Sequence, residues 1–349
     1  MEKFKSPSVY PFENNATAME LTQPSSFNHV PIVSIILPTY NRAHSLERAI
    51  RSVLAQTLSN FELIVVDDGS TDDTAHLVER FGDSRIRLLS LGRNYGAGRA
   101  RNKGIEAASA EFVAFLDSDD EWMPRKLELQ VARLRATNDP RVTVAYCLED
   151  LYFEATNNKV QSQGGICEGD LFDHLLGGLW LSTSILLVKR SSMVSIGGFD
   201  ESLPSFQDYD LCLRLAQASN YFVAVNEPLA VRYCHTDSRI SNDPTAALRG
   251  FQNINHKWGS VMKSRLGATT YDRWVSKSLL RIQDIQVKKA VREGKRLKAF
   301  RYCLAMSRFL PFSVGALSRG LLLVGLGQDS YLALVRAKNS RVAQTSNSQ

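Results

Sequence analysis

The sequence predicts an α/β fold, built on a mostly parallel sheet flanked by helices, and three observations lead to this prediction. Short apolar runs that suit buried strands recur through the first 120 residues. Segments with apolar residues at helical spacing separate these runs, and strands that alternate with helices require crossover connections between parallel strands. Polar or acidic clusters follow three of the runs, as expected where a parallel sheet binds a ligand beyond the carboxyl ends of its strands.

The elements follow in order from the first apolar run, residues 33–37, which ends at Pro38. A second run, 63–66, ends in the acidic segment 67–72, and a short third strand is predicted over 86–89. Two helices lie between these strands, because apolar residues recur at helical spacing. These residues are Leu46, Ala49, Ile50, Val53 and Leu54 after the first strand, and Leu77, Val78 and Phe81 after the second.

The fourth apolar run, residues 112–116, ends in three acidic residues at four positions, Asp117, Asp119 and Asp120. Carboxylates this close repel one another unless a cation lies among them. Mg²⁺ takes oxygen ligands and commonly shares its coordination between one or two carboxylates and substrate phosphates. The Asp-x-Asp motif therefore predicts a metal–diphosphate site. Taken alone, the motif is also compatible with a solvated loop that caps the next helix.

Six segments occur in an order and spacing that together match a known family, and they are residues 33–41, 62–72, 94–104, 115–120, 197–201 and 207–214. With these segments the chain resembles family 2 glycosyltransferases of the GT-A (Rossmann-like) fold, over roughly residues 30–235. The resemblance implies an inverting, metal-dependent enzyme of the hexosyltransferase type. Such an enzyme would move a sugar from a nucleoside diphosphate donor to a hydroxyl of a saccharide or lipid-linked acceptor, in cell-surface polysaccharide biosynthesis.

On the donor side, the resemblance implies that Tyr40 stacks on the nucleotide base and that Asp68 accepts a hydrogen bond from the base. Pro38 and Thr39 would shape this pocket, and Asn94 belongs to the same set of donor-binding residues. UDP-linked donors are the commonest expectation for the family, while GDP and dTDP donors stay open.

Around the diphosphate, the resemblance places Asp117 near the ribose and makes Asp119 a ligand of Mn²⁺ or Mg²⁺. Arg101 would either neutralise part of the diphosphate or hold the loop over it; the alternative is an ordinary arginine on a helix surface. His235 is a further candidate metal ligand, although a lone histidine is more often structural. A bound cation would stabilise the charge that develops on the leaving group.

On the acceptor side, Asp208 is expected to be the general base, because the attacking hydroxyl must lose its proton. The family usually has Glu-Asp here, whereas this chain has Gln207, which removes a negative charge beside the base and should lower the pKa of Asp208 slightly. The alternative is that Asp208 only caps the following helix. Trp180 is expected to stack on an acceptor sugar or lipid, or else to belong to the core.

The length of 349 residues suits one large domain with an appendage. We expect a flexible tail over residues 1–29, a catalytic domain over 30–240, and a basic, partly apolar helical region over 241–349. The five cysteines are odd in number and lack Cys-x-x-Cys spacing, which favours a reducing compartment. No apolar leader is seen near the N-terminus, so the expected location is the cytoplasm.

Positive charge is concentrated in residues 251–349, which contain 18 Lys and Arg against 4 Asp and Glu, a net charge of +14. The uncharged stretches 309–318 and 320–328 have about half of the ~20 apolar residues that a spanning helix needs. Basic side chains beside apolar ones predict peripheral contact through 287–327 with the inner face of the cytoplasmic membrane. The alternative is a helical bundle that packs on the catalytic domain.

Three other functions have less support in the sequence. A GT-A-like sugar nucleotidyltransferase typically has a Gly-rich, basic loop after the first strand, where this chain has residues 39–41. A non-catalytic nucleotide-sugar binder would be favoured by the loss of Asp119 or Asp208, and both are present. Nucleic-acid binding would be favoured by aromatic residues interleaved with the basic ones, and the basic region lacks such a platform.

Overall fold

The computed structural model of the chain describes residues 30–160, 166–234 and 243–307. These residues fall into two compact units. Among the described residues, the sheet unit comprises 30–152, 159–160, 166–203 and 207–233, and the helical unit comprises 153–158, 204–206, 234 and 243–307. Each unit is described by itself.

Four parallel strands form one half of the sheet, in the order β3-β2-β1-β4. Every residue of β1 and β2 is buried, and Ile35 lies opposite Leu63 in their shared register. The structure confirms the four strands predicted from the apolar runs and extends β1 and β2 by a few residues. Their bounds are Val33–Thr39 for β1, Phe61–Asp67 for β2, Ile86–Ser90 for β3 and Phe112–Phe115 for β4.

The other half of the sheet continues beyond β4 in the order β8-β6-β9-β5, with β7 beside β6. The pairs β4–β8, β8–β6 and β9–β5 are antiparallel, so the sheet as a whole is mixed. The predicted parallel arrangement therefore holds for the first half. The bounds are Glu121–Trp122 for β5, Val142–Phe153 for β6, Asn158–Val160 for β7, Leu186–Lys189 for β8 and Tyr221–Cys234 for β9.

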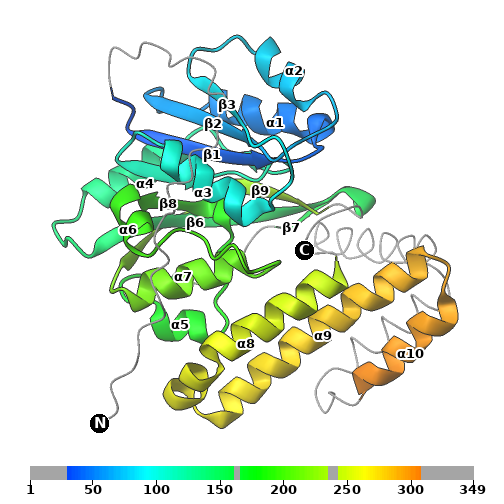
Figure 1. The fold of residues 1–349 in the computed structure, drawn as a ribbon. Helices are drawn as coiled ribbons and strands as arrows, with labels where there is room; N and C mark the ends of the chain where they lie inside the picture. The colour runs from blue at the N-terminus through cyan, green and yellow to red at the C-terminus, as the bar shows by residue number, and fades with distance from the viewer. Residues whose placement is uncertain (1–29, 161–165, 235–242, 308–349) are drawn as a thin grey trace, which may run out of the picture. The chain divides into compact units, whose positions relative to one another are not determined.

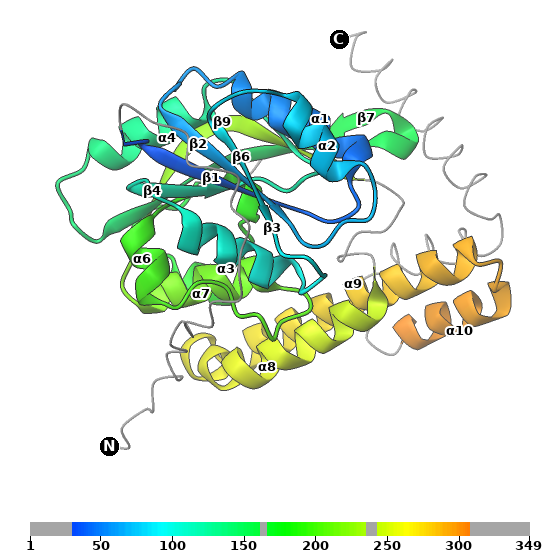
Figure 2. The same cartoon turned by 45° about the horizontal axis from the view of Figure 1, so that its top comes forward.

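Helices cover both faces of the sheet, because β1, β2 and β4 of the parallel half are buried on both sides. Figures 1 and 2 show α1 and α2 on one face, and α3, α6 and α7 on the other. The helices are α1 (Ala43–Leu54), α2 (Thr74–Arg80), α3 (Ala97–Ala107), α4 (Lys126–Arg135), α5 (Phe172–Leu176), α6 (Arg190–Ser195) and α7 (Gln207–Gln217), with short 3₁₀ turns η1 (Glu154–Thr156) and η2 (Thr183–Ile185).

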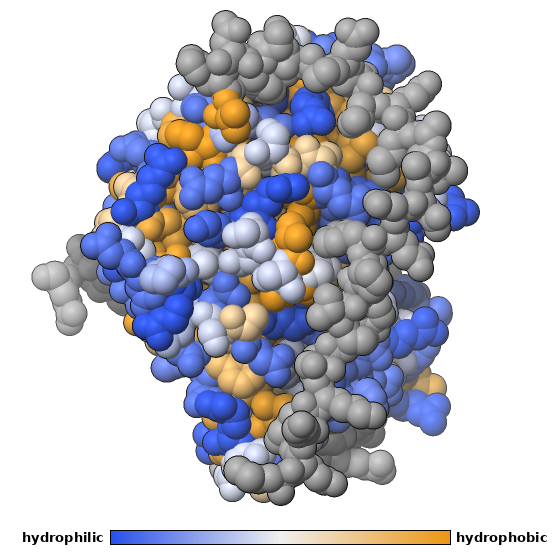
Figure 3. Space-filling model, turned by 60° about the vertical axis from the view of Figure 1, so that its left-hand side comes forward, coloured by the Kyte–Doolittle hydropathy of each residue, from blue (hydrophilic) through white to orange (hydrophobic). Residues whose placement is uncertain are grey.

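The surface of the molecule differs from this apolar interior. On the face drawn in Figure 3, hydrophilic residues surround several smaller hydrophobic patches.

The helical unit contains α8 (Pro244–Leu266), α9 (Ala268–Arg292) and α10 (Arg296–Ser307). The Asp243 side chain accepts a hydrogen bond from the backbone N–H of Thr245 at 3.1 Å and so caps the start of α8. Aromatic side chains of α8 and α9 pack together, since the rings of Phe251 and Trp274 are stacked 5.4 Å apart. Across the described residues, each helix is too short or too polar to cross a membrane. The apolar segment after residue 307 lies outside those residues.

Candidate functional site

The acidic end of β2 is fixed by the loop that precedes α3. The two carboxylate oxygens of Asp68 accept hydrogen bonds from the backbone N–H groups of Tyr95 and Gly96, both at 2.8 Å. Gly69 makes this approach possible, because its φ is +77° and a Cβ there would lie 2.5 Å from the Cα of Arg93. Burial raises the pKa of Asp68, while the two backbone hydrogen bonds oppose that rise.

The end of β1 carries the residues predicted to hold a nucleotide base. Tyr40 is 43% exposed, while the Thr39 hydroxyl is buried and has no hydrogen-bond partner in the described part of the chain. Asn41 joins this loop to the loop after β2, because its N–H donates to the Ser70 hydroxyl at 2.9 Å and its side-chain oxygen accepts from the N–H of Thr71 at 2.8 Å. The loop therefore presents an exposed ring beside a buried polar atom.

Two other predicted donor-binding residues have structural roles in these loops. Pro38 is buried within β1, opposite Val66 of β2. The side-chain oxygen of Asn94 accepts a hydrogen bond from the N–H of Gly96 at 3.0 Å, in the same loop that Asp68 holds.

The acidic loop after β4 is held by side chains from distant elements. The Ser184 hydroxyl donates to Asp120 at 2.9 Å and accepts from the N–H of Asp117 at 3.3 Å. Arg48 of α1 donates to the carbonyl oxygen of Asp119 at 2.8 Å. Neither Ser184 nor Arg48 was predicted from the sequence to act here, because they lie 64 and 71 residues from Asp120 and Asp119 and belong to no local motif.

Arg101 connects the acidic loop to the start of α7. Its side chain is only 10% exposed, and it donates to the Asp117 carboxylate at 2.7 Å and to the Gln207 side-chain oxygen at 2.9 Å. Its Nε is buried and has no hydrogen-bond partner in the described part of the chain. Of the two alternatives for Arg101, a surface helix arginine is therefore wrong, because the side chain is buried between two segments of the site.

The described residues contain no group of three or more His, Cys, Asp or Glu side chains placed to hold a metal ion. At this strand end Asp117 is 36% exposed and Asp119 is buried, while the buried Asp120 accepts hydrogen bonds from the Ser184 hydroxyl and the N–H of Tyr233. We therefore consider Asp117 and Asp119 as ligands. Such a donor set fits an ion that completes its coordination with substrate phosphate oxygens, as Mg²⁺ commonly does. His235, the other candidate ligand, lies outside the described residues.

Asp208 occupies the first turn of α7, where Trp180 reaches it from a different loop. The indole N–H of Trp180 donates to one Asp208 oxygen at 2.8 Å, and the backbone N–H of Tyr209 donates to the other at 2.9 Å. Burial raises the pKa of the Asp208 carboxyl, and the hydrogen bonds and the charge of Arg101 oppose that rise. The ring of Trp180 also stacks on that of Tyr209, with centroids 5.2 Å apart.

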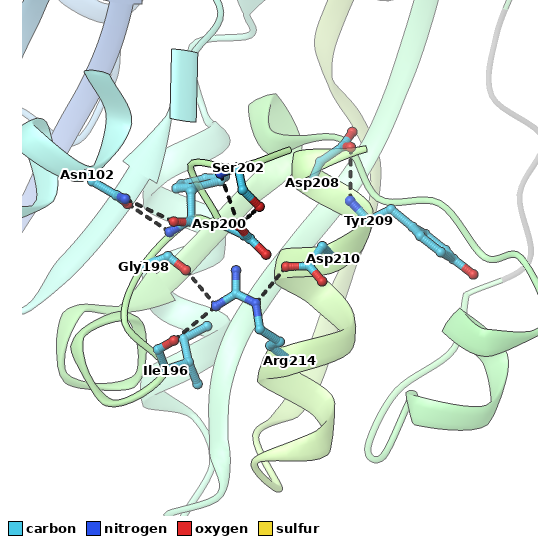
Figure 4. Close-up of polar contacts among 10 residues, drawn as sticks. Asn102, Ile196, Gly198, Asp200, Ser202, Asp208, Tyr209, Asp210 and Arg214 are labelled. Carbon is cyan, nitrogen blue, oxygen red and sulfur yellow. Dashed lines mark hydrogen bonds and ion pairs between the residues drawn. The ribbon is translucent and has the colours of Figure 1, made fainter. Parts of the chain in front are cut away.

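Figure 4 shows how the segment before α7 is anchored on both sides. Asn102 of α3 accepts from the N–H of Phe199 at 2.7 Å and donates to its carbonyl oxygen at 2.9 Å. Gly198 has a φ of +69°, and a Cβ there would collide with the Asn102 side chain. Arg214 donates to Asp210 at 2.7 Å and to the carbonyl oxygen of Gly198 at 2.7 Å. This part of the motif set therefore positions α7, and with it Asp208.

Residues 34–171 match the family model described as glycosyl transferase family 2. The chain is 34% identical over 207 residues to the amylovoran biosynthesis glycosyltransferase AmsB of Erwinia amylovora, an alignment that covers 56% of this chain and 68% of AmsB. It is 49% identical over 107 residues to WfgD of Escherichia coli, a UDP-Glc:α-D-GlcNAc-diphosphoundecaprenol β-1,3-glucosyltransferase. That alignment covers 31% of this chain and 42% of WfgD, so it spans less than half of that relative.

Among solved structures, the fold is similar to that of residues 1–349 of S. aureus TarS in complex with UDP-GlcNAc. The TM-score is 0.54 at 18% sequence identity, and the superposition covers 90% of this chain and 92% of that one. At this identity the likeness concerns the fold alone. It agrees with the GT-A architecture expected from the sequence.

Proposed function

Because the chain belongs to glycosyltransferase family 2, we propose that it transfers a sugar, with inversion, from a nucleoside diphosphate donor to a hydroxyl of a saccharide or lipid-linked acceptor. The placement of Arg101 carries the proposal, since one buried guanidinium joins the acidic loop at Asp117 to Gln207, the neighbour of Asp208. Donor-binding and base residues thereby share one site. The names of AmsB and WfgD support a role in polysaccharide biosynthesis and a UDP-linked donor.

The donor would lie beyond the carboxyl ends of β1, β2 and β4, as ligands do in parallel sheets. Tyr40 would stack on the base, and the buried hydroxyl of Thr39 is available as a hydrogen-bonding group. Asp68 would accept from the base while it holds the loop before α3, because each carboxylate oxygen has a further lone pair. These assignments place the nucleoside at the parallel half of the sheet.

A divalent ion, Mn²⁺ or Mg²⁺, would be held by Asp119 with support from Asp117. Bound there, it would stabilise negative charge on the departing diphosphate. The protein's own contribution is to hold the loop still, since Ser184 and Arg48 fix its backbone and its last carboxylate. Arg101 neutralises part of the acidic charge and orients Asp117.

Asp208 would take the proton of the acceptor hydroxyl as that oxygen reaches the anomeric carbon. Trp180 and the N–H of Tyr209 each occupy one carboxylate oxygen, which fixes the orientation of the group. A raised pKa makes the ionised carboxylate a stronger base. One catalytic carboxylate suffices for a single displacement with inversion, since a retaining reaction of the hydrolase type needs a second as nucleophile.

A panel of sugar nucleotides would test the proposal. The full chain is incubated with UDP-, GDP- and dTDP-linked sugars and Mn²⁺, and the released nucleoside diphosphate is measured with and without EDTA. We expect release from at least one donor and its loss on chelation. If nucleoside diphosphate is still released in the presence of EDTA, the metal has no part in the reaction. If the chain neither binds nor cleaves any of the donors, the proposal of sugar transfer is wrong.

A second part of the proposal concerns the membrane, and it rests on α10. Leu297 is 76% exposed and Phe300 is 40% exposed, three residues further along the same helix face. Lys298 and Arg301 are exposed beside them. Exposed apolar side chains among basic ones suit an anionic lipid surface, so we propose that residues 287–327 contact the inner face of the cytoplasmic membrane. Of this segment, 308–327 lies outside the described residues.

Sedimentation with vesicles would test this contact. Vesicles of phosphatidylcholine with ~30% phosphatidylserine should bind the wild-type chain, whereas a double variant, Leu297→Ser with Phe300→Ser, should bind about tenfold or more weakly because two apolar insertions are lost. Val194→Ser is the matched control, since Val194 is an apolar residue of the sheet unit that is 43% exposed. Equal binding by the double variant and the control would contradict the membrane contact.

A further inference from the structure

Two exposed arginines share one aromatic ring at the start of α3. The guanidinium carbons of Arg93 and Arg99 each lie 4.5 Å from the ring centroid of Tyr95. Tyr95 is itself 38% exposed, and the Arg99 side chain is 43% exposed. We call these three residues the arginine clamp. The proposed transfer reaction has so far used none of their side chains.

The backbone under the arginine clamp is firmly held. The N–H groups of Tyr95 and Gly96 donate to Asp68, and Gly69 lets the backbone of Arg93 come close to the end of β2. The clamp is therefore attached to a residue of the donor-binding set. Its ring and guanidinium groups project from a rigid base, which lowers the entropic cost of binding a ligand there.

The clamp also lies close in sequence and space to the acceptor side. Arg99 and Arg101 sit two positions apart on α3, and Arg101 donates to Gln207, the neighbour of the proposed base. A Cβ at Gly98 would lie 3.1 Å from the Nε2 of Gln207, so this turn of α3 packs against the start of α7. The clamp is thus placed between the end of β2 and the segment that carries Asp208.

The charge of the clamp is poorly balanced within the protein. Arg99 has a carboxylate oxygen of Glu201 at 3.8 Å, but both side chains are more than 40% exposed, and such pairs contribute little. Within the described residues, no ion pair joins Arg93 to a carboxylate. The charge of Arg99 also acts on Asp68, where it opposes the rise in that group's pKa, and the two oxygens of Asp68 accept backbone hydrogen bonds. Two like charges held at one ring repel each other, and an anion bound beside the ring would relieve that repulsion.

From these observations we propose that Arg93, Tyr95 and Arg99 bind a phosphate or diphosphate group of the acceptor, which names a phosphate-bearing acceptor for the site. Guanidinium groups favour phosphate because their paired N–H donors match two phosphate oxygens at once. The inference rests on the proposed function, since it assumes that a second substrate approaches Asp208. It assigns the donor diphosphate to the acidic loop and a different anion to the clamp.

A simple lipid diphosphate can test the clamp without knowledge of the acceptor sugar. Dodecyl diphosphate is titrated into the full chain in the presence of saturating UDP and Mg²⁺, and the dissociation constant is measured by calorimetry below the micelle concentration. Dodecyl maltoside, which has a similar chain and no charge, serves as the neutral probe. We expect the diphosphate to bind measurably and more tightly than the maltoside, and its binding to weaken as salt is raised.

Substitutions in the arginine clamp test whether dodecyl diphosphate binds there. Arg93→Ala combined with Arg99→Ala should weaken dodecyl diphosphate binding about ten- to a hundredfold, the range for charge-assisted hydrogen bonds. UDP affinity should stay unchanged. Arg125→Ala is the matched control, because Arg125 is an exposed arginine that also has a carboxylate, Glu128, at 3.8 Å. Tyr95→Phe should bind as the wild type does, since it retains the ring.

Several results would overturn the assignment. If saturating UDP abolishes binding of the lipid diphosphate, or if the double variant loses UDP affinity, the clamp belongs to the donor site. If the double variant and Arg125→Ala bind alike, the clamp is not the binding site. A different result would contradict the proposed function. In that case the chain would neither bind nor cleave any sugar nucleotide in the donor panel, which contains no lipid.

Discussion

The parallel and antiparallel halves of the sheet supply different parts of the candidate site by different means. In the parallel half, β1, β2 and β4 end side by side, and their carboxyl ends carry Thr39, Asp68 and the acidic loop. In the antiparallel half, the proposed base stands on the first turn of α7, and Trp180 orients it from a separate loop. Topology gathers the first set, and Ser184 and Arg48 then fix the acidic loop within it, whereas specific side-chain contacts create the second set.

The difference separates two tasks that a transferase must perform. Residues at the parallel strand ends should govern binding of the sugar nucleotide, because they surround the proposed nucleoside and diphosphate. Residues of the antiparallel half should govern turnover, because the proton of the acceptor is taken there. Arg101 connects the halves through Asp117 and Gln207, so a change at that connection should affect both.

The largest effect is expected from Asp208→Asn, which should impair turnover, the task assigned to the antiparallel half, and leave donor binding intact. Turnover should fall by about 10² or more, the usual scale for loss of a general base, while UDP affinity stays at the wild-type value. Product formation and UDP calorimetry measure the two quantities. Unchanged turnover would remove Asp208 as the base, and a parallel loss of UDP affinity would contradict the division of tasks.

The same variant should fold at least as stably as the wild type at neutral pH. The pKa of Asp208 is raised in the folded state, so the stability linked to its protonated form is fully present below the unfolded pKa of about 3.9. That stability is lost as pH rises through the folded-state pKa. Asparagine carries no charge, and its single carbonyl oxygen can accept from only one of the two N–H groups that Asp208 accepts from, those of Trp180 and Tyr209. We expect removal of the buried charge to offset the hydrogen bond that is lost. A lowered thermal midpoint at pH 7 would show that the ionised carboxylate stabilises the fold.

Asp119→Asn should impair metal-dependent binding of UDP, the task assigned to the parallel half. Mn²⁺ should tighten UDP binding to the wild-type chain, and this gain should fall about tenfold or more in the variant because a charged ligand of the ion is lost. Affinity for UDP without metal should change little. Asp73→Asn is the control, since Asp73 is an exposed carboxylate beside α2. If Mn²⁺ tightens UDP binding equally in Asp119→Asn and the control, Asp119 is not a metal ligand.

The parallel half was also the more predictable of the two. Continuous apolar runs predict β1, β2 and β4 because these strands are buried on both faces, and the acidic residues that follow them mark the strand ends. No strand was predicted over β6, because its second half is mostly half-buried and its buried residues 144–146 pair with β8, about 40 residues further along the chain. Exposed or half-buried strands leave a weaker pattern in the sequence.

The contacts that complete the site were beyond prediction for a related reason. Arg101 and Gln207 are 106 residues apart, and Trp180 meets Asp208 across 28 residues and two loops. The motifs identified these residues as candidates, but nothing in their spacing says which side chains touch. The use of Asp68 as a holder of the loop before α3 was missed too, since its partners are backbone N–H groups.

Gln207→Glu would test how the contact between Arg101 and residue 207, which joins the two halves, affects the base Asp208. The new carboxylate would pair with Arg101 and add a negative charge beside Asp208, so the pKa of Asp208 should rise further. The base works only when it is ionised. The acid limb of the kcat/KM profile should therefore move to higher pH, with the plateau at alkaline pH nearly unchanged. A profile that does not move would show that Gln207 is electrically isolated from the base.

The smallest effect is expected from Trp180→Phe, which removes one hydrogen bond and keeps an aromatic ring against Tyr209. The indole N–H lowers the pKa of Asp208, so its loss should raise that pKa and move the acid limb of the profile to higher pH. Because the carboxylate also loses one orienting contact, kcat should fall by a few fold even on the alkaline plateau. Asp208→Asn combined with Trp180→Phe should be no slower than Asp208→Asn alone, since Trp180 acts through that carboxylate. An additive loss would mean that Trp180 contacts the acceptor directly, which is one of the two alternatives that the sequence leaves open.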